Sequence, residues 1–260
     1  MNGKTILLFV MVLMLTTYAF GQHFDREADF RWERIGNSIK ITEYIGQNTQ
    51  VRIPPQIRGL LVTEIDNSAF MARGLVSVSI PDHVVTIREH AFSGNQLVEV
   101  KLGSRVMTIG YAAFFDNRIT RIDIPNSVVT IEDHAFNKNQ LFIVEIPNSV
   151  INVGSGAFAN NRITNVVLGN RVRSIGEHVF DNNYVTNITI SNGISVIHGN
   201  VFAGTFRSIS RIVIGSNVNI RASVPADVVW EGFRNAYSAN GHRAGAYTLQ
   251  NDGRWGFQAN

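Results

Sequence analysis

A phenylalanine recurs at a constant interval of 22 residues through the middle of this 260-residue chain. The seven positions are Phe70, Phe92, Phe114, Phe136, Phe158, Phe180 and Phe202. Ala precedes the first five of these residues and Val precedes the last two. A fixed period between about 20 and 29 residues is typical of solenoids, in which each coil buries its apolar residues against neighbouring coils. The chain is therefore predicted to fold as a stack of coils, with the phenylalanines inside.

Each unit also carries the pattern of a short strand. In the unit that begins at Phe92, the apolar strand positions are Leu97, Val100 and Leu102. Val100 and Leu102 are two residues apart, so their side chains share one face of a strand. Pro or Gly follows the last apolar position in most units, and these residues end a strand and begin a turn. The next apolar residues, such as Val106 and Ile109, are spaced by three. This spacing favours a tight 3₁₀-like or irregular return rather than a long helix.

Asparagine forms a second regular series, three residues after the phenylalanine. Its members are Asn95, Asn117, Asn139, Asn161 and Asn183. Asn side chains readily hydrogen-bond to nearby backbone groups, so this series is expected to hold the turn that enters each strand. A row of ligand-binding amides is the alternative interpretation.

The segments that flank the repeats are predicted to cover the open ends of the stack, since an uncovered terminal coil would expose its core. Residues 22–52 form the predicted N-terminal strand cap. Within it, Ser38 to Ile45 alternates apolar and polar residues, and a turn leads to a second strand at Val51 to Ile53. These two strands are expected to cover the first coil together. Ile53 and Pro54 are also expected to mark the strand end of an expanded first coil, in which extra residues around Arg58 and Gly59 bulge outward.

Residues 216–260 form the predicted C-terminal cap. A helix is expected over 227–238, with Trp230, Phe233 and Tyr237 on one face. A hairpin with an Asp-Gly turn is expected to follow it. A separate aromatic platform for carbohydrate is the alternative interpretation of this aromatic-rich tail.

The first 21 residues resemble a signal peptide. Lys4 precedes an uncharged apolar run from Ile6 to Leu15, and the small residues Ala19 and Gly21 suit cleavage before Gln22. The alternative is an uncleaved anchor, although the run is shorter than the ~20 residues of a typical span. No stable membrane span is expected after cleavage. The chain contains no cysteine, which suits an exported bacterial protein better than a disulfide-rich secreted one.

The composition and motifs favour a non-catalytic protein. The formal net charge of +3 is too close to balance to predict nucleic-acid binding. No nucleophile elbow, P-loop, H-E-x-x-H or EF-hand motif occurs in the sequence. His90, His134 and His178 recur in alternate units, about 10 Å apart if strands stack normally, so they cannot share one zinc ion. We therefore expect neither a metal site nor a cofactor, and no enzymatic activity.

The repeats resemble the BspA-like, treponemal type of leucine-rich repeat. The pattern I-x-I-P-x-x-V-x-x-I-x-x-x-A-F-x-x-N is visible from Ile122 to Asn139. The resemblance implies a curved leucine-rich-repeat solenoid over residues 53–215, with a β-strand and a short return in each coil and a cap at each end. Gly103, Gly169 and Ser191 depart from the pattern, which has Pro at these positions. Members of this family are typically exported surface or secreted bacterial proteins, and several act as adhesins.

Recognition by the outward face of the strands is the predicted function. The candidate ligand-facing residues are Glu99, Lys101, Arg121, Asp123, Phe142, Ile143, Glu145, Asn165, Val167, Asn187, Thr189, Arg211 and Val213. Their chemistry varies between repeats, as a recognition surface permits and a core does not. The expected ligand is a protein, such as one of the host extracellular matrix or cell surface. A carbohydrate-binding or envelope-structural protein is the alternative. The localisation expected is outside the cytoplasm: the periplasm, the cell surface or the medium.

Overall fold

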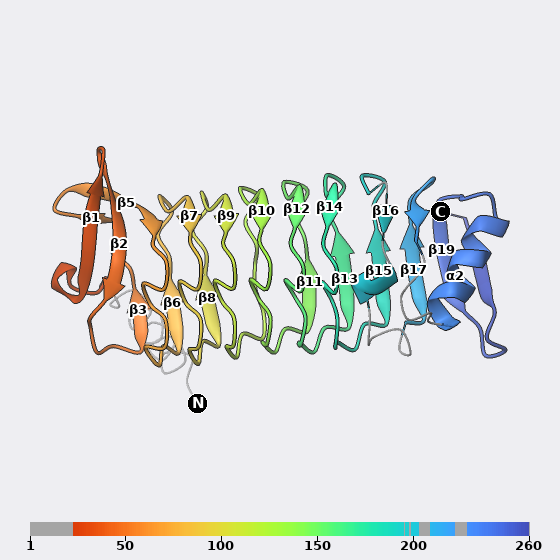
Figure 1. The fold of residues 1–260 in the computed structure, drawn as a ribbon, viewed down its shortest axis with the longest axis horizontal. Coiled ribbons are helices and arrows are strands. Elements are labelled where there is room, and N and C mark those ends of the chain that lie inside the picture. Colours follow the sequence, from red (N-terminus) through yellow and green to blue (C-terminus); the bar gives the residue numbers. More distant parts are fainter. Residues whose placement is uncertain (1–22, 195, 198, 203–208, 222–227, 260) are drawn as a thin grey trace, which may run out of the picture.

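The computed structural model of the chain describes residues 23–194, 196–197, 199–202, 209–221 and 228–259. Its coils stand side by side in one row, which is nearly straight in the view of Figure 1, with a strand-rich end and a helix-containing end. The expected signal peptide and the irregular stretch near Thr205 lie outside the described residues.

Two rows of short strands run along the stack (Figure 1). The lower row comprises β3 (Gln50–Arg52), β6 (Ser77–Ser79), β8 (Glu99–Lys101), β11 (Ile143–Glu145), β13 (Asn165–Leu168), β15 (Asn187–Ile190) and β17 (Arg211–Ile214). The upper row comprises β7 (Thr86–Ile87), β9 (Thr108–Ile109), β10 (Thr130–Ile131), β12 (Asn152–Val153), β14 (Ser174–Ile175), β16 (Val196–Ile197) and β18 (Asn219–Ile220). Within each sheet, neighbouring strands of a row pair in parallel, with residues 22 apart in register in most pairs, as Ile87 is with Ile109. The upper row is divided between β14 and β16, which belong to separate sheets.

The upper row corrects the expectation that the returns are wholly 3₁₀-like or irregular. Each return contains a two-residue strand. Turns on either side of it are closed by bonds between residues three apart, such as Val84 N–H to Pro81 O at 3.1 Å and Ala91 N–H to Arg88 O at 3.3 Å. The tight turns were therefore predicted correctly. Short strands form between these turns because stacking places each return beside the equivalent return of the next coil. The backbone N–H and C=O groups of the two returns can then pair.

The lower row is interrupted at one coil. Residues 119–124 fit the strand pattern, yet they form no strand, and β8 and β11 belong to separate sheets. Ile119 and Ile122 are nevertheless buried, so this coil keeps its place in the core. Two of its outward residues pair with each other, with Arg121 Nε 3.0 Å from Asp123 Oδ1.

The seven repeat phenylalanines form a continuous buried spine. From Phe92 to Phe202 the centroids of neighbouring rings lie 5.2, 5.3, 5.4, 5.8 and 5.4 Å apart, with the ring planes within 12° of parallel. Burying each ring contributes roughly 1.5–3 kcal/mol by transfer from water. The spine thus supplies a similar stabilising contribution at every coil.

The asparagine series has the structural role that the sequence predicted. Asn139 is buried, and its Oδ1 accepts a bond from Ile119 N–H of the preceding coil at 3.0 Å. Its Nδ2 donates to Phe114 O of that coil at 2.9 Å and to Phe136 O of its own coil at 3.2 Å. Asn95, Asn117, Asn161 and Asn183 repeat this arrangement. Each amide therefore joins two coils through buried hydrogen bonds.

The N-terminal end is built differently from the prediction. The short helix η1 (Glu27–Asp29) leads into β1 (Phe30–Ile35), which pairs antiparallel with β2 (Ser38–Tyr44). The strand predicted at 51–53 does not join β2. It is β3, which pairs with β6 and begins the lower row, as expected for the strand of an expanded first coil. The predicted bulge is a hairpin between β4 (Gln56–Ile57) and β5 (Leu60–Ile65), turning at Arg58 and Gly59 with positive φ.

At the C-terminal end, helix α2 (Val228–Ala239) is followed by a hairpin of β19 (Gly245–Leu249) and β20 (Trp255–Gln258). Trp230, Phe233 and Tyr237 are buried, as the predicted apolar face requires. Strand β19 pairs antiparallel with β17 and so covers the edge of the lower row. The last return, β18, pairs with β16, so the coils extend past the predicted boundary at residue 215.

Candidate functional site

The outward side chains of β11, β13, β15 and β17 form two parallel files. Strand register places Ile143, Asn165, Asn187 and Arg211 in the first file and Glu145, Val167, Thr189 and Val213 in the second. Alternate residues of each strand point inward to the core, which leaves these eight side chains on the outside. We call them, together with Phe142, the strand face.

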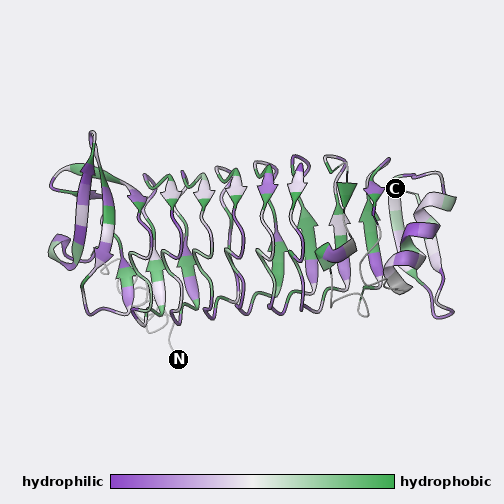
Figure 2. Cartoon of the chain, in the orientation of Figure 1, coloured by the Kyte–Doolittle hydropathy of each residue, from purple (hydrophilic) through white to green (hydrophobic). Residues whose placement is uncertain are grey.

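One end of the strand face is apolar. Phe142 is 47% exposed, Ile143 51% and Val167 40%. In Figure 2 the ribbon of β11 and β13 is largely green, whereas β6 and β8 also show white and purple residues. Polar residues continue the first file, where Asn187 Nδ2 donates to Asn165 Oδ1 at 3.2 Å, and Glu145 and Thr189 lie on either side of Val167 in the second file. The strand face therefore presents exposed apolar side chains with a polar border.

The remaining predicted ligand-facing residues lie on neighbouring coils, outside the sheet that contains β11, β13, β15 and β17. Glu99 and Lys101 belong to β8, in the separate N-terminal sheet. Arg121 and Asp123 belong to the coil that interrupts the row. This coil still stacks between its neighbours, since Arg118 N–H donates to Leu97 O and Gln140 N–H donates to Ile119 O, both at 3.0 Å. A ligand face that includes all thirteen residues therefore stays a prediction.

Glu99 and Lys101 instead line a cleft of about 1160 Å³ beside the N-terminal segment. Asp25 holds that segment to the edge of β3: its N–H donates to Arg52 O at 2.9 Å, and its Oδ2 accepts from Arg52 N–H at 2.6 Å. Asp82 also lines the cleft. Its pKa is lowered because Ser104 N–H donates to its Oδ1 at 2.9 Å.

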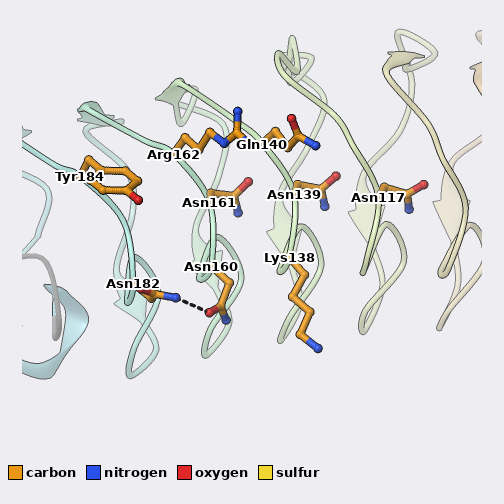
Figure 3. Close-up of a pocket in the computed structure, with 9 residues that line it drawn as sticks. All are labelled: Asn117, Lys138, Asn139, Gln140, Asn160, Asn161, Arg162, Asn182 and Tyr184. Atoms are coloured by element: carbon orange, nitrogen blue, oxygen red, sulfur yellow. Dashed lines mark hydrogen bonds between the residues drawn. The ribbon is translucent and has the colours of Figure 1, made fainter.

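A second concave feature, which the sequence prediction missed, lies at the corner where each coil enters its lower strand. It is a groove of about 380 Å³ that crosses several coils. Figure 3 shows its residues in three rows. Asn117, Asn139 and Asn161 form the middle row, Gln140, Arg162 and Tyr184 lie on one side, and Lys138, Asn160 and Asn182 lie on the other. We call this feature the corner groove. The available signal was the variation at the position just after each buried asparagine.

The repeat histidines occupy strained backbone positions. His90, His134 and His178 have φ values of 54°, 57° and 56°, in the left-handed region that begins the turn before each phenylalanine. The Tyr111 ring lies between two of them, 5.2 Å from His90 and 5.9 Å from His134 between ring centroids. In the part of the chain that the structure describes, no three His, Asp or Glu side chains gather as a metal site would require.

Comparison with known proteins shows the protein family to which this chain belongs. The model of the BspA type leucine rich repeat region matches in 6 copies, over residues 63–184 and 113–224. These matches cover more than half of the chain, and the chain belongs to this family of leucine-rich-repeat proteins. No curated protein matches the sequence.

Two solved structures illustrate the likeness. The Treponema pallidum leucine rich repeat protein shares 26% identity with a TM-score of 0.53, over 77% of this chain and 86% of that one. A leucine-rich repeat protein from Eubacterium ventriosum shares 16% identity with a TM-score of 0.42, over 72% of this chain and 64% of that one.

Membership supports a coarse statement of function. Leucine-rich-repeat solenoids of this kind are generally non-catalytic, protein-binding modules, and BspA-type members are typically bacterial surface proteins. Among the described residues, no helix has the length and apolar character needed to span a membrane.

Proposed function

We propose that this chain is an exported, non-catalytic bacterial protein that binds another protein through the strand face. The observation that supports this proposal is the exposed apolar group of Phe142, Ile143 and Val167 on a regular, paired sheet. Exposed apolar side chains with a polar border are a common feature of protein-binding surfaces. At the position of Phe142, the neighbouring coils carry Thr120 and Thr164.

The rigid support of these side chains favours recognition. Val144 and Val166, on the opposite side of the same strands, are buried in the core. The strand face is therefore held in one arrangement before a partner arrives, which lowers the entropy cost of binding. The partner class that fits is an extracellular protein with a complementary apolar patch.

The C-terminal aromatic residues favour a cap over a carbohydrate platform. The rings of Phe233 and Tyr247 pack 5.5 Å apart between centroids, and both residues are buried. Trp230 is also buried, with its centroid 5.9 Å from that of Phe202. Deleting this segment would uncover the last coil, so surface substitutions give a cleaner test than truncation.

The test uses protein beginning at residue 23, immobilised and exposed to an extract of extracellular-matrix proteins, with bound proteins identified by mass spectrometry. A variant with Phe142→Ser, Ile143→Ser and Val167→Ser is expected to lose the captured protein. The control variant carries Met71→Ser, Met107→Ser and Tyr111→Ser, which remove exposed apolar side chains elsewhere on the coils. Equal capture by both variants would contradict the proposal. Sequencing the N-terminus of secreted protein tests export, since cleavage is expected before Gln22.

A further inference from the structure

In the corner groove, the middle row of asparagines already uses its amide groups in hydrogen bonds, whereas other lining side chains have donors and acceptors that are not used. Each amide of the middle row is hydrogen-bonded to backbone groups. For example, Asn161 Oδ1 accepts from Leu141 N–H at 3.0 Å, and Asn161 Nδ2 donates to Phe136 O at 3.0 Å. Within the described part of the chain, the side chains of Gln140, Arg162 and Tyr184 make neither a hydrogen bond nor an ion pair. These three side chains are therefore available to a ligand.

The positive charge of the groove lining favours an anionic ligand. Its nine lining residues include Lys138 and Arg162 and no carboxylate. Neither cation takes part in an ion pair with a described residue, although Lys138 Nζ lies 5.1 Å from the centroid of the Phe115 ring. Unpaired cations in a concave site raise the local concentration of anionic ligands. Arginine also binds carboxylate and sulfate groups through two parallel hydrogen bonds.

The shape of the groove suits a linear ligand that lies along the solenoid axis. The same three positions recur at each coil, and the spine rings beneath them are 5.3, 5.4 and 5.8 Å apart. Successive pyranose rings of an extended saccharide advance by about one such coil spacing. In the row that contains Lys138, Asn182 Nδ2 donates to Asn160 Oδ1 at 2.8 Å, so the amides of neighbouring coils are linked along the groove.

Tyr184 adds an aromatic surface at one end of the groove. It is 64% exposed, and Figure 3 shows it in the same row as Arg162 and Gln140. A tyrosine ring can pack against the C–H face of a sugar while the tyrosine hydroxyl forms a hydrogen bond with water. A single-stranded nucleic acid would instead be expected to stack bases on successive rings, and the groove lining has one ring.

We propose that the corner groove binds an acidic oligosaccharide, one that carries carboxylate or sulfate groups. Arg162 and Lys138 hold the acidic groups, Tyr184 packs against a sugar ring, and the amides of Gln140, Asn160 and Asn182 bond to hydroxyl groups. This site is separate from the strand face and does not depend on the proposed protein binding.

The test is calorimetric titration of protein that begins at residue 23 with a heparin-derived tetrasaccharide. Neutral cellotetraose has the same number of sugar rings, and sodium sulfate supplies the anion without the sugar. Arg162→Gln is expected to weaken tetrasaccharide binding about tenfold or more, as loss of a charged hydrogen bond implies. Tyr184→Ala is expected to weaken it about fivefold.

The matched control is Arg171→Gln, which removes one exposed cation at the turn that follows β13. It is expected to change the affinity less than about twofold, because distant surface charges are screened. The proposal is overturned if Arg171→Gln weakens binding as much as Arg162→Gln, if cellotetraose binds as well as the acidic tetrasaccharide, or if sulfate alone competes fully. Competition by oligothymidylate would assign the groove to nucleic acid and overturn it as well. The Phe142, Ile143 and Val167 triple variant should bind the tetrasaccharide normally, which separates this test from that of the strand face.

Discussion

The ring of Tyr44 lies 5.4 Å from the ring of Phe70 between centroids, with their planes 17° apart. Tyr44 belongs to β2, outside the 22-residue repeat, yet it continues the phenylalanine spine by one more ring. Phe30 packs against both rings, and Trp230 ends the spine at the other terminus. Both ends of the stack are therefore covered by aromatic side chains that the repeat itself does not supply.

Tyr44→Ala is expected to destabilise the N-terminal coils by about 3–5 kcal/mol, because it leaves a cavity above Phe70. Contacts in a solenoid connect neighbouring coils, so the effect should fade along the stack. Hydrogen exchange should show lost protection in β2 to β7 and unchanged protection in β15 and β17. Tyr44→Phe is the control: it keeps the ring and removes the bonds of the hydroxyl with Asn48, and should cost about 1 kcal/mol. Uniform loss of protection along the chain would contradict this prediction.

Asn139→Ala is expected to lower the free energy of unfolding by about 2–6 kcal/mol, since Ile119 N–H and Phe114 O would be left buried without this partner at ~1–3 kcal/mol each. Chemical denaturation followed by circular dichroism measures the change. Asn126→Ala, at an exposed turn, is the control and should stay within about 0.5 kcal/mol of the parent. Similar losses in the two variants would show that the buried amide does not join the coils as described.

Gly169→Ala is expected to destabilise the protein by about 1–3 kcal/mol, the usual cost of overpacking. A Cβ there would lie 2.5 Å from Pro147 O, which explains why this coil carries Gly where the family pattern has Pro. Gly232→Ala is the contrasting change in α2, where a Cβ would be 3.6 Å from the Trp255 ring. It should raise stability by about 0.5–1 kcal/mol through helix propensity. Thermal unfolding distinguishes the two, and the same sign for both would contradict the prediction.

The N-terminal cap is expected to lose stability in acid through Asp29. The hydrogen bond from the Arg26 guanidinium, 2.8 Å from Asp29 Oδ1, lowers the pKa of this carboxyl below its ordinary value. A lowered pKa means that the contribution to stability is present above about pH 4 and is lost as the pH falls through the folded-state value. Asp29→Asn should be less stable than the parent at pH 7 and should show a smaller decrease in acid.

The difference between these two pH profiles is the quantity to measure, since the pKa values of Asp66 and Asp82 are also lowered and contribute equally in both proteins. Thermal unfolding from about pH 7 to about pH 3 gives both profiles. Parallel profiles would show that the pairing of Arg26 with Asp29 does not stabilise the folded chain.

Several features of the fold could be predicted because they repeat locally. The burial of Phe136 and the bonding of Asn139 to backbone groups follow from residue type and spacing, and the structure confirms both. The helix with Trp230, Phe233 and Tyr237 on one face was predictable from a 3.6-residue period. The candidate site was only partly predictable. Ile143 and Val167 do lie on one exposed face, whereas Lys101 lies beside the N-terminal segment, which no periodicity identifies.

The sequence by itself determined the period, the spine and the identity of the inward residues, because burial of Phe and pairing of Asn depend on chemistry that recurs in every unit. Only the tertiary structure decided which strands join. It paired β3 with β6 rather than β2, left residues 119–124 outside the sheets, and brought Arg162 and Tyr184 to one groove. Hydrogen bonds between coils connect residues about 22 positions apart, and their formation depends on how each coil stacks on the next. That stacking is a property of the assembled solenoid, and a single repeat does not contain it.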